Sequence, residues 1–408
     1  MTTTPAHESD SDRKLRILHV LRAPLGGLFR HVIDLTYEQI SRGHAVGLVV
    51  DSSTGGMRAS EILGRLEPLL ALGILRLPIR RQPHFDDIVN AGRIALHSRR
   101  LGADIVHGHG SKGGAYARFP AFVPGFRQPV RVYTPHGGSF NYRSHPVVDA
   151  GLMAIERLLV RNTDIFLFES AFIRRVFHER VGATRKLIRT VANGLSPAEF
   201  APVTTDPDAA EFLYVGELRA VKGIDTLIDA LTLIASRDPS PPATKPRLVL
   251  VGSGPEKEKL TAYAQSRNVQ HLVTFAGALP AAEAFRLGRV LVVPSRAESL
   301  PYIVLEAAAA HVPMVATDVG GINEIFGPYR DRLIPCGDPE ILADRLERAL
   351  TQPESERQND AAKLASFVAL RFTIAGMADA VLAGYFEALD RKRNPREATT
   401  PSFALPSR

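Results

Sequence analysis

Short apolar segments of strand type alternate with segments of helix type along most of the chain, and this alternation begins twice. The first run starts at Leu15 with the strand-like LRILHVL and the helix-like HVIDLTYEQISRG, which closes at Gly43. The second run starts at residue 212 with FLYVGEL and the helix-like GIDTLIDALTLIAS. Such alternation is typical of parallel sheets covered by helices on both faces. We therefore predict two doubly wound, Rossmann-like α/β domains.

A stretch rich in Pro, Thr and Asp interrupts the alternation and marks the domain boundary. The predicted parts are a disordered N-terminus (1–13), an N-terminal domain (14–200), a linker (201–211), a C-terminal domain (212–372), a C-terminal helix (373–391) and a flexible tail (392–408). Ligands of doubly wound folds bind beyond the carboxyl ends of the strands. We therefore expect a binding site in a cleft between the two domains.

The composition limits the cellular compartment and the partners. The single cysteine, Cys336, allows no intrachain disulfide, the N-terminus is too polar for a secretion signal, and no apolar stretch reaches membrane-spanning length. These features predict a cytoplasmic protein. Residues 1–203 carry 27 Lys and Arg against 17 Asp and Glu, so all of the net charge of +7 comes from this half. An anionic membrane surface, on the inner face of the plasma membrane, or solubility alone explains this excess. The chain has no nucleic-acid-binding module, so we expect no nucleic acid as partner.

Glycine and cationic residues follow several predicted strands. Gly26 and Gly27 precede a helix, where backbone can approach an anion, although a simple tight turn has the same pattern. VGSGP lacks the third glycine of a dinucleotide fingerprint, so we expect no nicotinamide and no other cofactor. Arg219 and Lys222 share one loop before a helix and suit a diphosphate, unless both are ordinary solvated cations.

Histidines follow two other strands. YTPHGGSF places His136 before two glycines, and VHGHGSKGG contains His107, His109 and Lys112. Closely spaced histidines can bind a metal ion. With one cysteine and no His-Glu-x-x-His helix, we expect no metal site.

One carboxylate, Glu306, interrupts an apolar run in SRAESLPYIVLEAAAAHVP. Pro301 to Ala310 is a predicted helix, with Ser299 as its capping residue. Because its other side chains are apolar on every side, the helix is predicted to be buried. A buried carboxylate needs a partner, which is either a ligand or an internal arginine or backbone group.

Taken together, these motifs resemble those of the retaining GT-B glycosyltransferases of the large group 1 family (glycosyltransferase family 4). Seven residues separate Glu298 from Glu306, as in the family's Glu-x7-Glu motif, and the pair stands between VLVVPS and VPMVATDVGGINE in the family's order. VANGLSPAEF is similar to the family's Asn-Gly loop, and GGLFRHV to its first glycine loop. The resemblance covers Leu15 to about Ala388. It implies a GT-B fold, with two Rossmann-like domains facing across a cleft.

The resemblance also implies roles for the matched residues. Glu306 would accept hydrogen bonds from the ribose of a nucleoside-diphosphate sugar (UDP or GDP), and Glu298 would lie at the hydroxyls of the donor sugar. The diphosphate would be bound by Lys222, Arg219 and the backbone of Ser299, Leu300, Pro301 and Tyr302, and Gly27 would let the first domain close over the phosphates. His136 would lie beside the reacting sugar and Asn193 near the cleft. The acceptor side would include His109 and Lys112.

The match departs from the family pattern in three places. Ser299 replaces a glycine, Glu217 occupies the position of the usual arginine, and His311-Val312 replaces the glycine before Pro313. Arg219, two residues after Glu217, is a candidate for the lost positive charge.

The resemblance implies metal-independent transfer of a sugar to a hydroxyl, with the anomeric configuration kept. We expect the acceptor at the first domain, as a glycan or a lipid-linked oligosaccharide in exopolysaccharide or envelope glycan synthesis. Residues 151–180 mix apolar faces with five arginines, which suits peripheral binding to an anionic membrane or ordinary core with solvated arginines. The alternatives are a nucleotide-sugar epimerase of GT-B fold, a phosphorylase with pyridoxal phosphate, and a non-catalytic partner subunit that binds nucleotide sugar.

Overall fold

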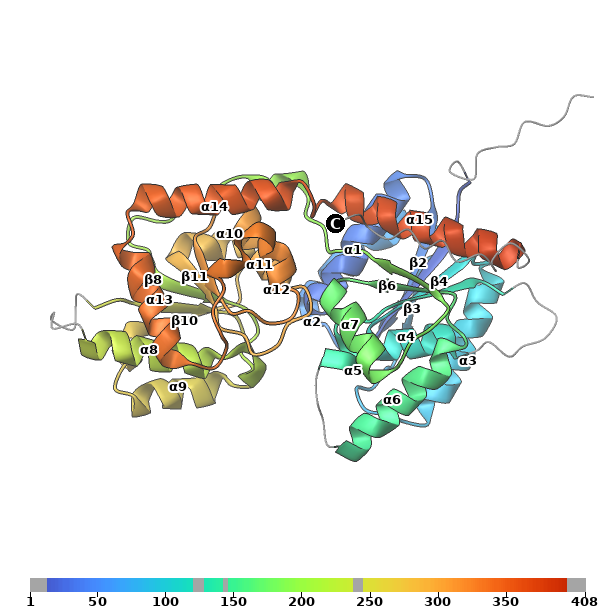
Figure 1. Cartoon of the computed structure of the whole chain (residues 1–408). Coiled ribbons are helices and arrows are strands. Elements are labelled where there is room, and N and C mark those ends of the chain that lie inside the picture. Colours follow the sequence, from blue (N-terminus) through green and yellow to red (C-terminus); the bar gives the residue numbers. More distant parts are fainter. Residues whose placement is uncertain (1–12, 120–127, 142–145, 238–244, 395–408) are drawn as a thin grey trace, which may run out of the picture. The chain divides into compact units, whose positions relative to one another are not determined.

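The structure is a computed structural model that describes residues 13–119, 128–141, 146–237 and 245–394. The chain divides into two compact units (Figure 1). Unit 1 comprises Met1–Glu169, Ile173–Val191 and Ala375–Arg408, and unit 2 comprises Ser170–Phe172 and Ala192–Ile374. Each unit has one sheet whose strand pairs are all parallel, so the prediction of two Rossmann-like α/β domains is confirmed.

Unit 1 contains a seven-stranded sheet in the order β3-β2-β1-β4-β5-β6-β7. Its strands are β1 (Arg16–Leu21), β2 (Ala45–Asp51), β3 (Ile74–Leu77), β4 (Ile105–His109), β5 (Val130–Thr134), β6 (Ile165–Phe168) and β7 (Leu187–Thr190). Its helices are α1 (Gly26–Ser41), α2 (Gly56–Leu66), α3 (Asp86–Arg100), α4 (Gly110–Arg118), α5 (Gly138–Asn141), α6 (Pro146–Val160), α7 (Ala171–Arg180) and α15 (Ile374–Arg393). A short 3-10 helix, η2 (Glu67–Leu69), follows α2. Helix α7 begins with two residues that cluster with unit 2, and α15 begins with one.

Unit 2 contains a five-stranded sheet in the order β10-β9-β8-β11-β12. Its strands are β8 (Ala210–Val215), β9 (Leu248–Val251), β10 (Val273–Gly277), β11 (Gly288–Val293) and β12 (Met314–Ala316). Its helices are α8 (Ile224–Arg237), α9 (Lys257–Ser266), α10 (Ala281–Ala284), α11 (Tyr302–Ala309), α12 (Ile322–Phe326), α13 (Pro339–Thr351) and α14 (Glu354–Ala369). The described residues of unit 2 also form five 3-10 helices: η3 (Pro197–Phe200), η4 (Ala220–Lys222), η6 (Gln270–Leu272), η7 (Phe285–Leu287) and η8 (Gly327–Arg332).

Burial explains why these segments form these elements. Five of the six residues of β1 are buried, which is the pattern of a strand covered on both faces. Helix α8 buries Ile224, Leu227, Ile228 and Leu231, whose spacing of three and four residues forms one face of a helix. Tertiary packing of these apolar faces supplies most of the stability of such helices.

Near the end of β4, the two faces of the unit 1 sheet are covered by different helices. Gly108 packs on α4, where an added Cβ would lie 2.6 Å from the carbonyl oxygen of Gly113. Its neighbours His107 and His109 point to the opposite face, because side chains alternate along a strand. Helix α15 covers that face, since the Tyr385 hydroxyl shares a 2.7 Å hydrogen bond with Nδ1 of His107.

The chain ends and domain boundaries can be compared with the predicted ranges. Strand β8 begins at Ala210, inside the range predicted as linker (201–211). The final helix runs to Arg393 and lies, apart from its first residue, in unit 1. The predicted disordered N-terminus lies outside the described residues except for its last residue, and so does the predicted tail from residue 395 onward. In the part of the chain that the structure describes, no helix is both long and apolar enough to span a bilayer.

Candidate functional site

The loops after β8, β9 and β11 contact one another through glycines. A Cβ at Gly252 would overlap the carbonyl oxygen of Gly216, and one at Gly223 would overlap that of Pro294. The loop after β8 is also bonded to the loop after β9, because the N–H of Leu218 donates to Ser253 (3.0 Å). These close contacts gather three strand-end loops at the carboxyl edge of the unit 2 sheet, where ligands of such folds bind.

Lys222 and Glu298 form an ion pair within this group of loops. The Lys222 Nζ lies 2.6 Å from Oε1 of Glu298, and the Ser295 hydroxyl donates to the same oxygen at 2.7 Å. Glu298 is buried, with 7% of its surface exposed. Because an unpaired buried charge is very costly, Lys222 and Ser295 together stabilise the ionised carboxylate. The structure thus brings together two predicted site residues from different loops.

A glycine pair lies directly against the segment that carries Glu298. Gly320 has φ of +64°, and a Cβ there would overlap the carbonyl oxygen of Glu298. The N–H of Gly321 donates to the carbonyl of Ser299 at 2.8 Å. Only residues without a side chain fit at both positions, so the loop after β12 fixes the backbone at Glu298 and Ser299.

Helix α11 begins next to this segment, and its start differs from the prediction. The N-cap residue is Pro301, which has extended backbone, and no described side chain caps the helix. The assignment of Ser299 as the capping residue is therefore wrong. Asn193 donates from Nδ2 to the carbonyl of Leu300 at 2.8 Å and so holds the segment just before the helix. Tyr302, the first helical residue, is buried.

Glu306 is not a fully buried carboxylate. Six of the eight residues of α11 are buried, but Glu306 is half-buried and keeps access to solvent. The prediction that this helix is buried on every side is wrong at Glu306 and at Ile303, which is also only partly buried. The buried carboxylate of the pair is Glu298, and its cationic partner is Lys222.

Arg219 is the residue predicted to replace the positive charge that is missing at Glu217. The Arg219 guanidinium lies 3.5 Å from the Glu217 carboxylate, and their side chains are 36% and 55% exposed. A surface pair of this kind contributes little to stability. Nearby, Arg296 binds Asp225 through two 2.8 Å hydrogen bonds and donates to the carbonyl of Ala220 at 2.7 Å, which fixes the loop between β8 and α8.

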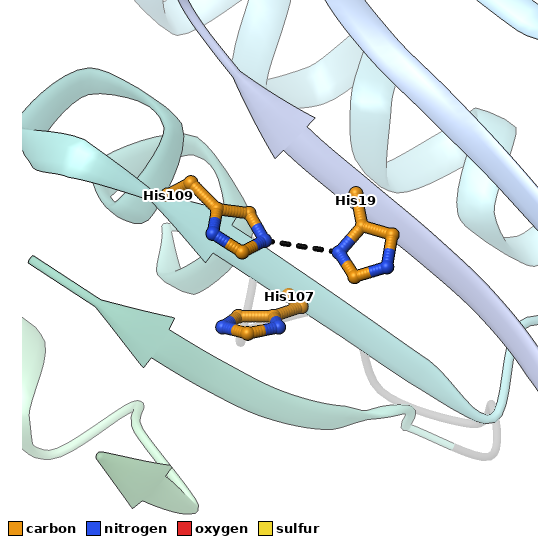
Figure 2. A group of neighbouring side chains, drawn as sticks. All are labelled: His19, His107 and His109. Atoms are coloured by element: carbon orange, nitrogen blue, oxygen red, sulfur yellow. Dashed lines mark hydrogen bonds between the residues drawn. The ribbon is translucent and has the colours of Figure 1, made fainter. Parts of the chain in front are cut away.

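Unit 1 contains a cluster of histidines at the carboxyl end of its central strands. His19 of β1 is the register partner of His107 of β4, and His109 follows on the same face. Figure 2 shows these three rings converging, with a hydrogen bond between Nδ1 of His19 and Nε2 of His109 (2.9 Å). His136, which follows β5, shares a 3.1 Å hydrogen bond between its Nε2 and Nδ1 of His109. His31 of α1 packs edge-on against His136, with ring centres 4.7 Å apart.

Four of these rings, those of His19, His107, His109 and His136, are held in the neutral state. Burial lowers the pKa of His19 to about 4, partly offset by its hydrogen bond to Gln39. Burial, together with neighbouring imidazoles, holds the pKa of His107, His109 and His136 well below the usual value. His136 also has φ of +51°, a conformation rare for a residue with a side chain. Such backbone strain clusters at functional sites.

The other predicted residues of unit 1 lie at the same sheet edge or beside it. Gly26, with φ of +66°, opens α1, and Gly27 is exposed in its first turn. Lys112 of α4 forms an ion pair with Asp87 and donates to the carbonyl of Gln82 at 3.0 Å. The Lys112 ammonium group therefore already binds Asp87 of α3 and the Gln82 carbonyl.

Two family models match the chain. The model described as Glycosyl transferases group 1 matches residues 196–365, and the model described as Glycosyltransferase Family 4 matches residues 25–199. The alpha-D-kanosaminyltransferase of Streptomyces kanamyceticus is 26% identical over 312 residues, which cover 71% of this chain and 78% of that relative. The chain is a glycosyltransferase of the group 1 type.

Solved structures confirm the GT-B fold of this glycosyltransferase. Sucrose-phosphate synthase from Thermosynechococcus elongatus matches with a TM-score of 0.76 and 20% identity, over 93% of this chain and 100% of that chain. The Anabaena Alr3699/HepE structure in complex with UDP-glucose matches with a TM-score of 0.71 and 16% identity, over 90% of this chain and 98% of that chain.

Some site features of the glycosyltransferase were missed in the sequence. Ser295 and the pair Gly320-Gly321 contact the segment around Glu298. Only the glycine pair carries a sequence signal, as a Gly-Gly turn shortly after a strand. His19 and Gln39 were also missed. His19 stands inside an apolar strand and Gln39 inside an amphipathic helix, so neither position looks like a site before the strands are paired.

Proposed function

We propose that this glycosyltransferase transfers a sugar from a UDP- or GDP-sugar to a hydroxyl acceptor and keeps the anomeric configuration. The observation that carries the proposal is the Lys222–Glu298 pair, 2.6 Å apart, held by strand-end loops directly before the N-terminus of α11. A cation beside a helix N-terminus suits a diphosphate. The buried carboxylate suits the hydroxyls of the sugar that the diphosphate carries.

The donor is assigned to residues of unit 2. Glu306, which is half-buried, accepts hydrogen bonds from the ribose hydroxyls in this proposal. Glu298 binds the donor sugar, and the backbone of Ser299, Leu300, Pro301 and Tyr302 binds the diphosphate. Asn193 supports this role indirectly, because its bond to the Leu300 carbonyl fixes the loop that leads to the helix. The bound UDP-glucose of the Anabaena structure supports a uridine donor, with GDP as the alternative.

Cleavage of the glycosidic bond leaves negative charge on the diphosphate. Lys222 and Arg219 are the cations proposed to stabilise it, with no metal ion in this scheme. Removing one such preplaced donor costs roughly 3 kcal/mol of transition-state stabilisation, or about a hundredfold in rate. Departure and attack on the same face let the leaving phosphate take the proton of the acceptor hydroxyl, which agrees with retention.

On unit 1 we assign Gly27 to space for the donor phosphates and His136 to the reacting sugar. His109 is only 1% exposed, and both its ring nitrogens are bonded to other imidazoles. We therefore place His109 behind His136 rather than in contact with the acceptor. Lys112 keeps its proposed acceptor-side role only if an acceptor displaces its bonds to Asp87 and Gln82.

The proposed acceptor is a lipid-linked oligosaccharide or other glycan of envelope or exopolysaccharide synthesis, met at an anionic membrane surface. The support is α6, which exposes apolar side chains along its outer side. They are Val147 (74%), Val148 (54%), Ile155 (51%) and Leu158 (58%). An amphipathic helix with exposed apolar residues and nearby arginines suits the membrane interface.

Two experiments test the proposal. A thermal-shift screen with UDP-, GDP- and ADP-sugars, followed by transfer assays with and without lipid-linked acceptor, should give a stabilising nucleotide and acceptor-dependent turnover. Conversion of the donor sugar without any acceptor would instead indicate an epimerase. For membrane binding, Ile155→Ser/Leu158→Ser should lose co-sedimentation with anionic liposomes, whereas Leu370→Ser, which alters another exposed leucine (85%), should not. Equal sedimentation of both variants would contradict docking through α6.

A further inference from the structure

Three hydrogen bonds connect Gln39 to His136. The His19 Nε2 lies 2.8 Å from Oε1 of Gln39, and the His19 Nδ1 lies 2.9 Å from Nε2 of His109. The chain then passes from Nδ1 of His109 to Nε2 of His136 at 3.1 Å. Each ring between the two ends uses both of its nitrogens.

The direction of every proton in this chain follows from its first member. An amide oxygen only accepts hydrogen bonds, so Nε2 of His19 carries the proton and Nδ1 of the same neutral ring does not. His19 Nδ1 therefore accepts, and the donor is the Nε2–H of His109. By the same step, Nδ1 of His109 accepts from the Nε2–H of His136.

The donors and acceptors can be assigned in only one way because the three rings are neutral. A protonated imidazole donates from both nitrogens, and the chain would then have no fixed direction. Burial lowers the pKa of His19 to about 4 and holds the pKa of His109 and His136 well below 6.5, so all three are neutral at neutral pH.

The Gln39 amide lies with its oxygen on His19. Its Oε1 is 2.8 Å from Nε2 of His19, and its Nε2 is buried and makes no hydrogen bond to any described residue. Two further hydrogen bonds lie beside this chain. The Tyr385 hydroxyl shares one with Nδ1 of His107 (2.7 Å), and Nε2 of His107 shares the other with the Thr134 hydroxyl (2.8 Å).

We propose that Gln39, His19 and His109 are positioning residues that hold His136 as the Nε2–H tautomer and leave its Nδ1 as a hydrogen-bond acceptor for a sugar hydroxyl. His136 is half-buried, and its Nδ1 makes no hydrogen bond to any residue in the described ranges. The role toward sugar rests on the proposed function. The tautomer itself rests only on the contacts within unit 1.

The same cluster has a rival interpretation as a metal site. One nitrogen from each of His19, His107 and His109 lies within 4.8 Å of the others (Figure 2). A divalent ion there would replace the proton shared by His19 and His109 and would detach His107 from Tyr385 or Thr134. The three rings are at most 1% exposed, and the group includes no carboxylate to balance the added charge. Burying that charge is costly, so the hydrogen-bonded chain is the better account.

Nitrogen-15 NMR of the full-length protein, labelled at histidine and recorded without substrate at neutral pH, measures the tautomers directly. The expected spectrum has protonated Nε2 and unprotonated Nδ1 for His19, His109 and His136. Protonated Nδ1 on these three rings would overturn the proposal. So would stoichiometric binding of Zn²⁺ that perturbs the His19 and His109 signals. Because no sugar is present, this result is independent of whether the proposed transfer reaction is correct.

A variant of Gln39 connects the tautomer to function. Gln39→Met removes the acceptor oxygen that fixes the His19 tautomer and should yield mixed tautomers of His136. For Gln39→Met we expect kcat to fall about twofold or more with little change in KM for the donor, because kcat scales with the fraction of His136 that presents Nδ1 as an acceptor. Thr36→Val, a buried polar position one turn away on α1, is the matched control and should change neither quantity. If Gln39→Met kept both the tautomer and kcat, the positioning role would be refuted.

Discussion

Replacing Lys222 by alanine should destabilise unit 2 as well as stop turnover. The substitution leaves the Glu298 carboxylate, which is 7% exposed, without its cation. Removing one partner of a buried ion pair costs about 3–5 kcal/mol. Ser295 still donates to Glu298, and the Lys222 side chain is 23% exposed, so the lower end of the range applies. For a unit of this size, a loss of about 3 kcal/mol lowers the melting temperature by about 6–12 °C.

The double variant Lys222→Ala/Glu298→Gln separates stability from chemistry. A neutral amide needs no cation, so the double variant should recover most of the lost stability and retain a deficit of about 1 kcal/mol. Scanning calorimetry measures the transition that shifts in Lys222→Ala, and a transfer assay on the same samples should find both variants inactive. The reasoning is refuted if Lys222→Ala melts within about 2 °C of the unmodified protein, which is less than 1 kcal/mol. It is also refuted if the double variant melts no higher than Lys222→Ala.

Three further perturbations test separate parts of the structure. Gly320→Ala should lower the melting temperature and weaken nucleotide binding more than the control variant Gly337→Ala. Both glycines have positive φ, so both variants lose about 1 kcal/mol of stability to backbone strain. Only at Gly320 would the added Cβ also overlap a carbonyl oxygen. Arg118→Met should lower the free energy of unfolding by about 3–5 kcal/mol in calorimetry, since it removes the guanidinium that lies 2.8 Å from the buried Glu156 carboxylate. Adding Glu156→Gln should recover most of this loss. Between pH 6.5 and about 4 the unfolded chain binds a proton at His19 that the folded chain does not. Acidification through this window should therefore lower the free energy of unfolding by about 1.4 kcal/mol per pH unit through His19 alone. His19→Gln should reduce the slope of stability against pH, and an unchanged slope would contradict the neutral assignment.

The alternation of strands and helices was predictable because strands buried on both faces are continuous apolar runs and helices buried on one face have a regular apolar spacing. The apolar run of β1 and the three-and-four spacing of α8 each specify one element without tertiary information. The start of α11 was not predictable in the same way. A proline ring fixes φ but not ψ, so Pro301 suits both the first helical position and the N-cap, and the structure has the second.

The environment of a charged side chain depends on packing that a helical wheel does not contain. The wheel of α11 is apolar around Glu306, yet the structure leaves this long side chain half-buried while Glu298, in a loop, is enclosed. The histidine cluster is a similar case. The spacing of His107 and His109 indicates a shared face, but their meeting with His19 requires the pairing of β1 with β4, which joins segments nearly 90 residues apart.

The measurement that tests the account most directly is the affinity of the protein for a nucleoside diphosphate with and without its ribose hydroxyls. Isothermal titration would compare UDP or GDP, whichever gives the larger thermal shift, with its 2′,3′-dideoxy form. Hydrogen bonds to a charged group contribute about 1.5–3 kcal/mol, so the unmodified protein should bind the dideoxy form about 10- to 100-fold more weakly. Glu306→Gln should lose most of that preference. If Glu306→Gln binds both nucleotides as the unmodified protein does, Glu306 does not bind the ribose and the assignment of the donor site is wrong.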